Sequence, residues 1–480
     1  MSLRKKTLSG LGWTFFQQFG VQLVSFLITI ILARILAPAE FGLIAMLSVF
    51  IAIGGLLVEG GLSSSLIRTR LATRKDYSTV FFFNLGGSVV IYLLICLFAP
   101  YIARFYHQEV LTNIIRVYAL VFIINAFYEI QNARLMKVMN FRIQTFIQIP
   151  AILISGLVAI LLALKGFGVW SLVWMNIVQS FIITVLHWVK SKWRPTLVFD
   201  KLCFKKHFHF GYKMTLSGLL DVLYKNIYIL IIGKNYAPAQ LGYYSRAESL
   251  SQLPSGNITT AINKVTYPMF ASISNDNNKL KMVYKKLMQQ VIFWNAAIMI
   301  LSVVIAEPLI RFLLTEKWLP AVPYFQILCL AGIFYPLHVY NLNILKVKGR
   351  SDLFLRLEFI KKVICVGGII LVIPLGIFGL LYFQLFFSLL ACYINSIYSK
   401  KLIQYSAKEQ LLDILPTLIL ASLTGLVCFF GDAFLYSTFH LTDLERLISN
   451  TLFFFTAYLG LSYLMQFNAM YDFKHLVLKQ

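Results

Sequence analysis

A seven-residue segment occurs twice in this chain, as APAEFGL at residues 37–43 and as APAQLGY at residues 237–243. Each copy follows a long apolar run. Proline cannot continue the preceding helix, and glycine permits the tight re-entry needed when a few residues join two long helices. Weaker matches follow in the same order, for example residues 99–105 with 306–312. The sequence therefore predicts a duplicated helical unit with two equivalent corners.

The composition places the chain in a membrane. Its 480 residues are 59% hydrophobic and 13% charged, with a mean hydropathy of +0.77, far from a soluble domain. A hydrocarbon core of about 30 Å needs roughly 20 apolar residues per helix. On that criterion the predicted spans are 11–33, 41–61, 79–101, 113–133, 143–164, 168–189, 211–233, 241–262, 288–308, 322–345, 359–375, 379–399, 411–431 and 450–467.

Connecting segments that are rich in Lys and Arg alternate along the chain with segments that contain few of these residues. With the N-terminus in the cytoplasm, the cytoplasmic segments carry 33 of the 43 Lys and Arg residues and the outer segments carry 8. Cytoplasmic loops are enriched in these residues. The alternation supports about fourteen spans with both termini in the cytoplasm.

The short loops leave no room for a soluble catalytic domain. Each repeat holds six spans, an even number, so both repeats begin on the same side of the membrane. Parallel repeats of this kind are related by an axis along the membrane normal, which predicts a V-shaped pair of lobes around a central cleft. We expect an all-α polytopic protein with two pseudo-symmetric six-helix lobes, at 1–195 and 196–405, and two additional transmembrane helices at 406–480.

Several short motifs carry a family resemblance across nearly the whole chain. They are the corner PAEFG at 38–42, GLSSSLIR at 61–68, MNFR at 139–142, LGYYSRA at 241–247 and VTYP at 265–268. With the six-plus-six-plus-two arrangement, they resemble the polysaccharide-transporter flippases. These are Wzx and WzxC-type members of the multidrug/oligosaccharidyl-lipid/polysaccharide exporter superfamily.

The resemblance implies transport of undecaprenyl-diphosphate-linked oligosaccharide, the repeat unit of an O-antigen, capsule or exopolysaccharide. Transfer would run from the inner to the outer leaflet of the bacterial cytoplasmic membrane by alternating access. The expected partners are this substrate, membrane lipid, and the polysaccharide polymerase and glycosyltransferases of the pathway. We expect a monomer that binds no nucleic acid and no cofactor. The six cysteines show no C-x-x-C spacing, so no metal site is expected.

A lipid-linked diphosphate needs cations along its path, and charged residues inside a membrane are costly unless they face water or a partner. Lys225 lies in the seventh predicted span and Arg246 in the eighth, accompanied by Asp221 and Glu248. We predict that the two cations form a site for the diphosphate. Two structural alternatives are that Asp221 and Lys225 neutralise each other as an i, i+4 pair, and that Arg246 extends to the membrane surface.

The first repeat contains acidic and amide side chains instead. Glu129 is the candidate for proton or cation coupling, and Glu59 is a second acidic candidate. Their alternatives are an interhelical hydrogen bond for Glu129 and an interfacial position for Glu59. The accompanying polar candidates are Gln18, Gln22 and Asn84. The candidates for a cytoplasmic vestibule are Lys264, Lys361 and Lys362, and the alternative is that they are positive-inside anchors.

Other function classes make different demands. A cation-coupled drug exporter of the same superfamily would keep the fold but favour acidic cavity residues. A membrane glycosyltransferase or polymerase would need a large outer loop, and the longest predicted outer segments, 309–321 and 432–449, are short. A scaffold would have no reason to bury Lys225 and Arg246. No G-x-x-x-x-G-K-[ST] motif is present, so ATP-driven transport is not expected.

Overall fold

The structure, a computed structural model, describes residues 3–471, apart from the side chains of residues 3–17, 257, 258 and 260–265. Within this range every regular element is a helix, which confirms the predicted all-α membrane fold. The chain forms two compact units, Met1–Gly242 and Tyr243–Gln480. We call them unit 1 and unit 2 and describe each by itself.

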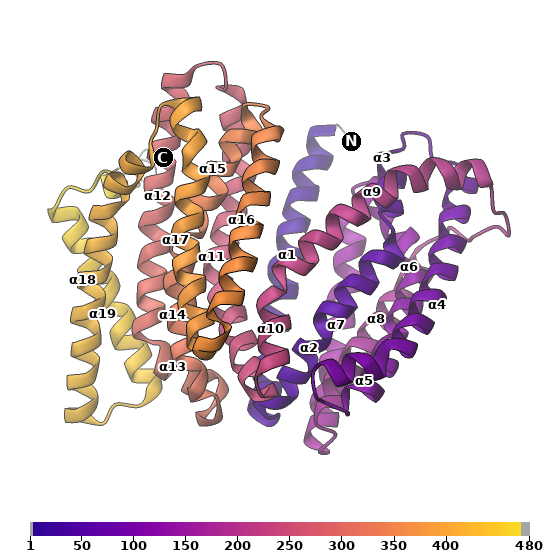
Figure 1. The fold of residues 1–480 in the computed structure, drawn as a ribbon, viewed down its shortest axis with the longest axis horizontal. Coiled ribbons are helices and arrows are strands. Elements are labelled where there is room, and N and C mark those ends of the chain that lie inside the picture. Colours follow the sequence, from indigo (N-terminus) through magenta and orange to yellow (C-terminus); the bar gives the residue numbers. More distant parts are fainter. Residues whose placement is uncertain (1–2, 472–480) are drawn as a thin grey trace. The chain divides into compact units, whose positions relative to one another are not determined.

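Unit 1 contains ten helices among the described residues (Figure 1). They are α1 (Leu3–Ile35), α2 (Pro38–Glu59), α3 (Leu62–Arg68), α4 (Arg74–Phe105), α5 (Leu111–Tyr118), α6 (Leu120–Lys137), α7 (Phe141–Leu164), α8 (Val169–Lys190), α9 (Lys201–Lys225) and α10 (Ile227–Asn235). The next helix, α11 (Pro238–Ser272), begins in unit 1 and continues into unit 2.

Unit 2 is built from the rest of α11 and the helices that follow. They are α12 (Asn277–Val304), α13 (Ala306–Leu314), the 3-10 helix η1 (Glu316–Ala321), α14 (Val322–Gly332), α15 (Tyr335–Val347), α16 (Ser351–Val372), the 3-10 helix η2 (Ile373–Leu375), α17 (Gly376–Ile403), α18 (Ala407–Phe439) and α19 (Asp443–Leu464). Figure 1 shows α16 beside α17 and α18 beside α19, and within each pair the two helices pack against each other.

All fourteen predicted segments are helical, but fourteen membrane crossings are not confirmed. By length and composition, 11 segments of the described chain can cross a membrane, or 12 if the bent pair α9 and α10 is one span. By the same criterion, residues 351–403 form one 53-residue segment. A continuous helix of that length would be about 80 Å long at 1.5 Å per residue. Pro374 and Gly376 break it at η2, so α16 and α17 can each cross. Helix α11 does not meet the criterion because it is too polar.

The two repeated corners meet each other in unit 1. A Cβ added to Gly42 would overlap the carbonyl oxygen of Pro238, and one added to Gly242 would overlap that of Pro38. The contact is reciprocal, as expected for equivalent positions of a duplicated unit. Proline starts α2 and α11 at the same place in each repeat, where its missing N–H costs no helical hydrogen bond.

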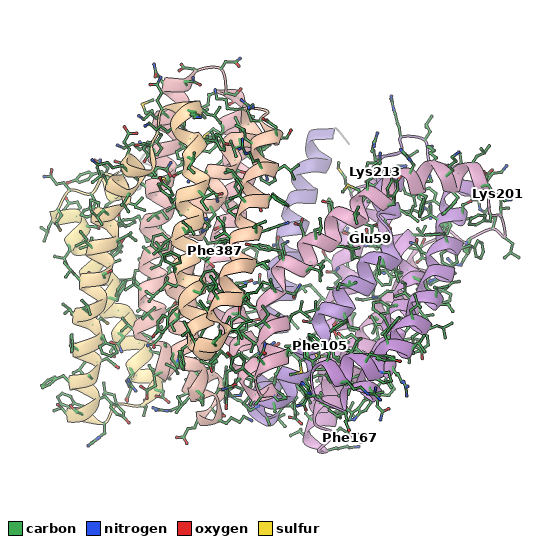
Figure 2. The ribbon with its side chains drawn as sticks, in the orientation of Figure 1. Glu59, Phe105, Phe167, Lys201, Lys213 and Phe387 are labelled. Carbon is green, nitrogen blue, oxygen red and sulfur yellow. The ribbon has the colours of Figure 1, made fainter. Side chains whose placement is uncertain are left out.

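The two ends of unit 1 are formed by different segments of the chain. Figure 2 places Phe105, the last residue of α4, and Phe167, between α7 and α8, at one end, and Lys201, the first residue of α9, at the other. Asp200 precedes α9 and accepts hydrogen bonds from the backbone N–H groups of Leu202 and Cys203, at 2.8 and 3.0 Å. The bonds from Cys203 and Leu202 lower the pKa of Asp200.

A buried polar chain attaches α9 to α3 and α4. The ring of His207 lies 2.8 Å from Ser65 Oγ through Nδ1 and 3.0 Å from Asp76 Oδ1 through Nε2. All three residues are buried. Thr73 donates its backbone N–H and its hydroxyl to the other oxygen of Asp76. Since buried polar groups are stable only when they are hydrogen-bonded, this chain fixes which side of α9 faces the protein.

The two helices of the α18–α19 hairpin extend into the predicted outer segment at 432–449. Arg446 donates two hydrogen bonds to Asp432, at 3.0 and 2.5 Å, and both residues are buried. The Thr442 side chain caps α19 together with Glu445. A paired, hydrogen-bonded charge can be buried where a single one cannot, so the helices continue through charged positions that mark a loop in a hydropathy profile.

Candidate functional site

A cavity of about 290 Å³ lies within unit 1, between α2, α6 and α9. Glu59 and Glu129 both line it, so the structure brings two of the predicted coupling residues to one place. Asn125 adds a third polar side chain. The remaining lining residues are Ala52, Gly55, Leu56, Val58, Phe122 and Val222. We call this the carboxylate cavity.

Helical spacing explains why these residues converge. On α2 the lining residues include positions 52, 55, 56 and 59, and on α6 they are 122, 125 and 129. Residues three or four positions apart lie on one face of a helix. Most of the lining residues therefore lie on one stripe of each helix, and Val58 lies beside that stripe on α2.

Two adjacent glycines of α2 have different roles at this cavity. A Cβ on Gly54 would overlap the ring of Phe122, so this glycine allows α2 and α6 to approach closely. A Cβ on Gly55 would meet no atom within 4 Å. Gly54 therefore sets the helix spacing, while Gly55 keeps space open beside Glu59.

The charge of the cavity determines what it can bind. Its lining contains two carboxylates, an amide and apolar side chains, and no Lys or Arg. Asn125 Oδ1 is buried without a hydrogen-bond partner among the described residues. Two carboxylates in one mostly apolar space need compensating positive charge. A proton or a small cation would supply it, and an anionic diphosphate would be repelled.

The other polar candidates of the first repeat lie elsewhere. Gln18 is exposed on α1, and Gln22 on the same helix is half-buried. Asn84 is fully buried in α4, and neither polar atom of its amide has a hydrogen-bond partner among the described residues. The lining of the carboxylate cavity does not include these three.

Asp221 and Lys225 lie in the last turns of α9, and both are exposed. Lys225 is the final residue of this helix, directly before a 49° bend between α9 and α10. The sequence predicts one continuous span over 211–233, whereas the structure breaks it at Asn226. Broken spans are common in transporters, where unwound backbone lines a binding site. Val222, one turn before the bend, lines the carboxylate cavity.

Arg246 and Glu248 are half-buried on α11, and both belong to unit 2. Glu248 accepts a hydrogen bond from the Gln252 amide at 3.3 Å. Because Lys225 belongs to unit 1, a diphosphate site shared by Lys225 and Arg246 stays a prediction.

The three vestibule candidates have different surroundings. Lys361 is buried on α16 and forms an ion pair with Glu358 at 2.5 Å. Lys362 is half-buried. The side chain of Lys264 lies outside the described residues.

Sequence reasoning missed the contribution of α9 to the first-repeat site. Val222 of α9 is apolar, as is Phe122 of α6, so nothing in their residue type distinguishes them from lipid-facing residues. The Asp76–His207 contact joins residues 131 positions apart, and a single sequence contains no signal for such a pair.

A family described as polysaccharide biosynthesis protein matches residues 31–323. Teichuronic acid biosynthesis protein TuaB of Bacillus subtilis is 24% identical over 363 residues, which cover 73% of each chain. Lipopolysaccharide biosynthesis protein WzxC of Escherichia coli is 23% identical over 373 residues, 77% of this chain and 76% of that one.

A solved structure is similar over nearly the whole length. Lipid II flippase MurJ, in an inward closed conformation, has a TM-score of 0.67 at 14% identity and covers 98% of this chain and 100% of its own. At that identity the likeness shows the fold. The family match and the named relatives confirm the family resemblance inferred from the sequence.

Proposed function

Because the chain belongs to the polysaccharide biosynthesis protein family, we propose that it flips undecaprenyl-diphosphate-linked oligosaccharide from the inner to the outer leaflet of the bacterial cytoplasmic membrane. The observation that carries this proposal is the family match combined with a flippase fold over 98% of the chain. The repeat unit of an O-antigen, capsule or exopolysaccharide is the cargo. The pathway's polymerase and glycosyltransferases are its proposed partners, and the protein acts as a monomer.

We assign different tasks to the two groups of charged residues. Lys225 and Arg246 bind the diphosphate, and the carboxylate cavity takes up a proton or small cation. Alternating access of two lobes, 1–195 and 196–405, would carry the cargo, with residues 406–480 as two additional helices. The acidic cavity also favours a second candidate, a cation-coupled drug exporter, because such a protein would need carboxylates without a diphosphate site.

Loss of the protein tests the proposal in cells. We expect the lipid-linked oligosaccharide to accumulate in the cytoplasmic leaflet and surface polysaccharide to disappear. The measurement is the leaflet distribution of the radiolabelled intermediate in spheroplasts. An unchanged distribution, together with increased sensitivity to organic cations, would support the drug-exporter alternative.

Glu129→Gln should make transfer insensitive to an imposed ion gradient, because the amide cannot take up a proton or balance a cation's charge. We expect a loss of roughly 10-fold in gradient-driven transfer, the size of one charge-assisted contact. Gly55→Leu should have a similar effect by filling the cavity. Transfer is measured in proteoliposomes with and without proton or sodium gradients.

Two variants serve as controls for this experiment. Glu109→Gln removes a carboxylate from an exposed position outside the cavity, and Gly86→Leu adds the same side chain where a Cβ meets no atom within 4 Å. Both should respond to a gradient as the wild type does. A wild-type response from Glu129→Gln would remove the coupling role from this cavity.

The proposed orientation places both termini in the cytoplasm. In a cysteine-free background, Phe167→Cys should react with a membrane-impermeant maleimide added to intact cells, because Phe167 is exposed at one end of unit 1 (Figure 2). Ala72→Cys should react only after the membrane is permeabilised. The reverse pattern would invert the topology.

A further inference from the structure

The first half of α9 carries an exposed basic surface that the transport proposal does not use. Its four lysines are Lys201, Lys205, Lys206 and Lys213, and all are exposed. Exposed apolar side chains lie among them, including Leu202, which is 80% exposed. No Asp or Glu occurs between Lys201 and Leu220. The side-chain charge of this surface is therefore entirely positive.

The opposite side of the same helix is fixed to the protein. His207, Gly211 and Thr215 are buried at a spacing of four residues. Gly211 approaches Gly60 so closely that a Cβ on it would overlap the Gly60 carbonyl oxygen. Together with the hydrogen bonds of His207, these contacts prevent α9 from turning its lysines toward the protein.

A row of aromatic rings lies along the flank of the basic surface. Phe204 and Phe208 have ring centroids 5.1 Å apart, and Phe208 and Tyr212 are stacked at 6.0 Å. Phe208 and Tyr212 are 42% and 43% exposed. Basic residues beside exposed aromatic and aliphatic side chains are typical of helices at a membrane surface, where rings enter the headgroup region and lysines meet anionic lipid.

Helix length places this surface at the membrane boundary. The bent span needs about 20 residues to cross the hydrocarbon core, and the mostly apolar stretch from Met214 to Gly233, whose charged residues are Asp221 and Lys225, supplies that length. Residues 201–213 then extend beyond the core. Figure 2 shows Lys201 and Lys213 along this part of α9, with Lys201 far from the end that carries Phe105 and Phe167.

We propose that the four lysines and the aromatic row of α9 form a binding surface for anionic phospholipid headgroups of the cytoplasmic leaflet. The assignment to that leaflet rests on the orientation given under the proposed function. We assign the surface to lipid because the exposed apolar side chains would enter the headgroup region of a bilayer. A soluble anion would pair with the lysines but leave these apolar side chains exposed to water. Each lysine near an anionic surface strengthens binding about fivefold.

The test uses the full chain in phosphatidylcholine bilayers with spin-labelled phosphatidylglycerol or spin-labelled phosphatidylcholine. It measures the relative association constant of the two lipids from the motionally restricted fraction. The wild type should prefer phosphatidylglycerol at 50 mM salt and lose most of that preference at 500 mM salt. The quadruple variant Lys201→Gln, Lys205→Gln, Lys206→Gln and Lys213→Gln should lose at least about fivefold at low salt.

A matched variant in unit 2 controls for total charge. Lys279, Lys400, Lys401 and Lys408 are also exposed, and their replacement by Gln should change the preference less than about twofold. An unchanged preference in the α9 variant, or an equal loss in the control, would overturn the proposal. So would normal lipid preference combined with lost oligosaccharide transfer, which would assign the lysines to the substrate. No cargo is present in the lipid measurement, so its outcome is independent of the proposed transport.

Discussion

Arg246→Glu should reduce oligosaccharide transfer more than about 100-fold while the protein still inserts and folds. A charge-assisted contact contributes about 1.5 to 3 kcal/mol, which corresponds to roughly 10- to 100-fold in binding, and the new carboxylate would also repel the diphosphate. Arg246→Lys should keep part of the activity, because the charge remains but bidentate binding is lost. Lys225→Ala should be milder than Arg246→Glu.

The measurement is transfer at matched protein levels in proteoliposomes. Arg104→Glu is the control, since Arg104 is an exposed arginine at the end of α4 and reversal of its charge tests a purely interfacial role. If Arg246→Glu transfers as well as Arg104→Glu and the wild type, Arg246 only anchors its helix. The diphosphate site would then have to be sought at Lys264, Lys361 and Lys362.

Gly42→Ala and Gly242→Ala should each destabilise the protein strongly. At both positions the new methyl group overlaps a backbone carbonyl oxygen of the opposite corner, which a change of side-chain rotamer cannot relieve. Overpacking of this kind costs about 1 to 3 kcal/mol and occasionally more, and we expect the upper end. The measurement is the thermal unfolding midpoint of each purified variant in detergent.

The matched control for these glycines is Gly86→Ala, in α4, where an added Cβ meets no atom within 4 Å. It should leave the midpoint within a degree or two of the wild type, since a well-placed alanine is favoured in a helix. Equal midpoints for Gly42→Ala and Gly86→Ala would show that the two corners do not pack as described.

The repeat was the most useful part of the sequence for predicting the fold. Proline and glycine in APAEFGL and APAQLGY predicted two equivalent corners, because their backbone requirements are local. Their reciprocal contact joins chain segments 200 residues apart, and the sequence analysis did not predict it.

Hydropathy did not show where buried charges are paired or where a predicted span bends. Arg446 and Asp432 neutralise each other between α18 and α19, so two helices continue into the segment between the predicted spans 411–431 and 450–467. The bend at Asn226 was equally hidden, since no proline or glycine marks it. At the carboxylate cavity, residue type identified Glu59 and Glu129 as candidates. Only the packing of α2 against α6 and α9 placed them on one cavity.

The most direct test of the proposed function is transfer by the purified protein. Undecaprenyl-diphosphate-linked oligosaccharide is incorporated into proteoliposomes, and a lectin that cannot cross the membrane reports how much of the sugar becomes accessible from outside. We predict protein-dependent transfer of the lipid-linked oligosaccharide, stimulated by an ion gradient and absent with Arg246→Glu. Transfer no faster than in protein-free liposomes, from a preparation that transports organic cations, would contradict the assignment as an oligosaccharide flippase.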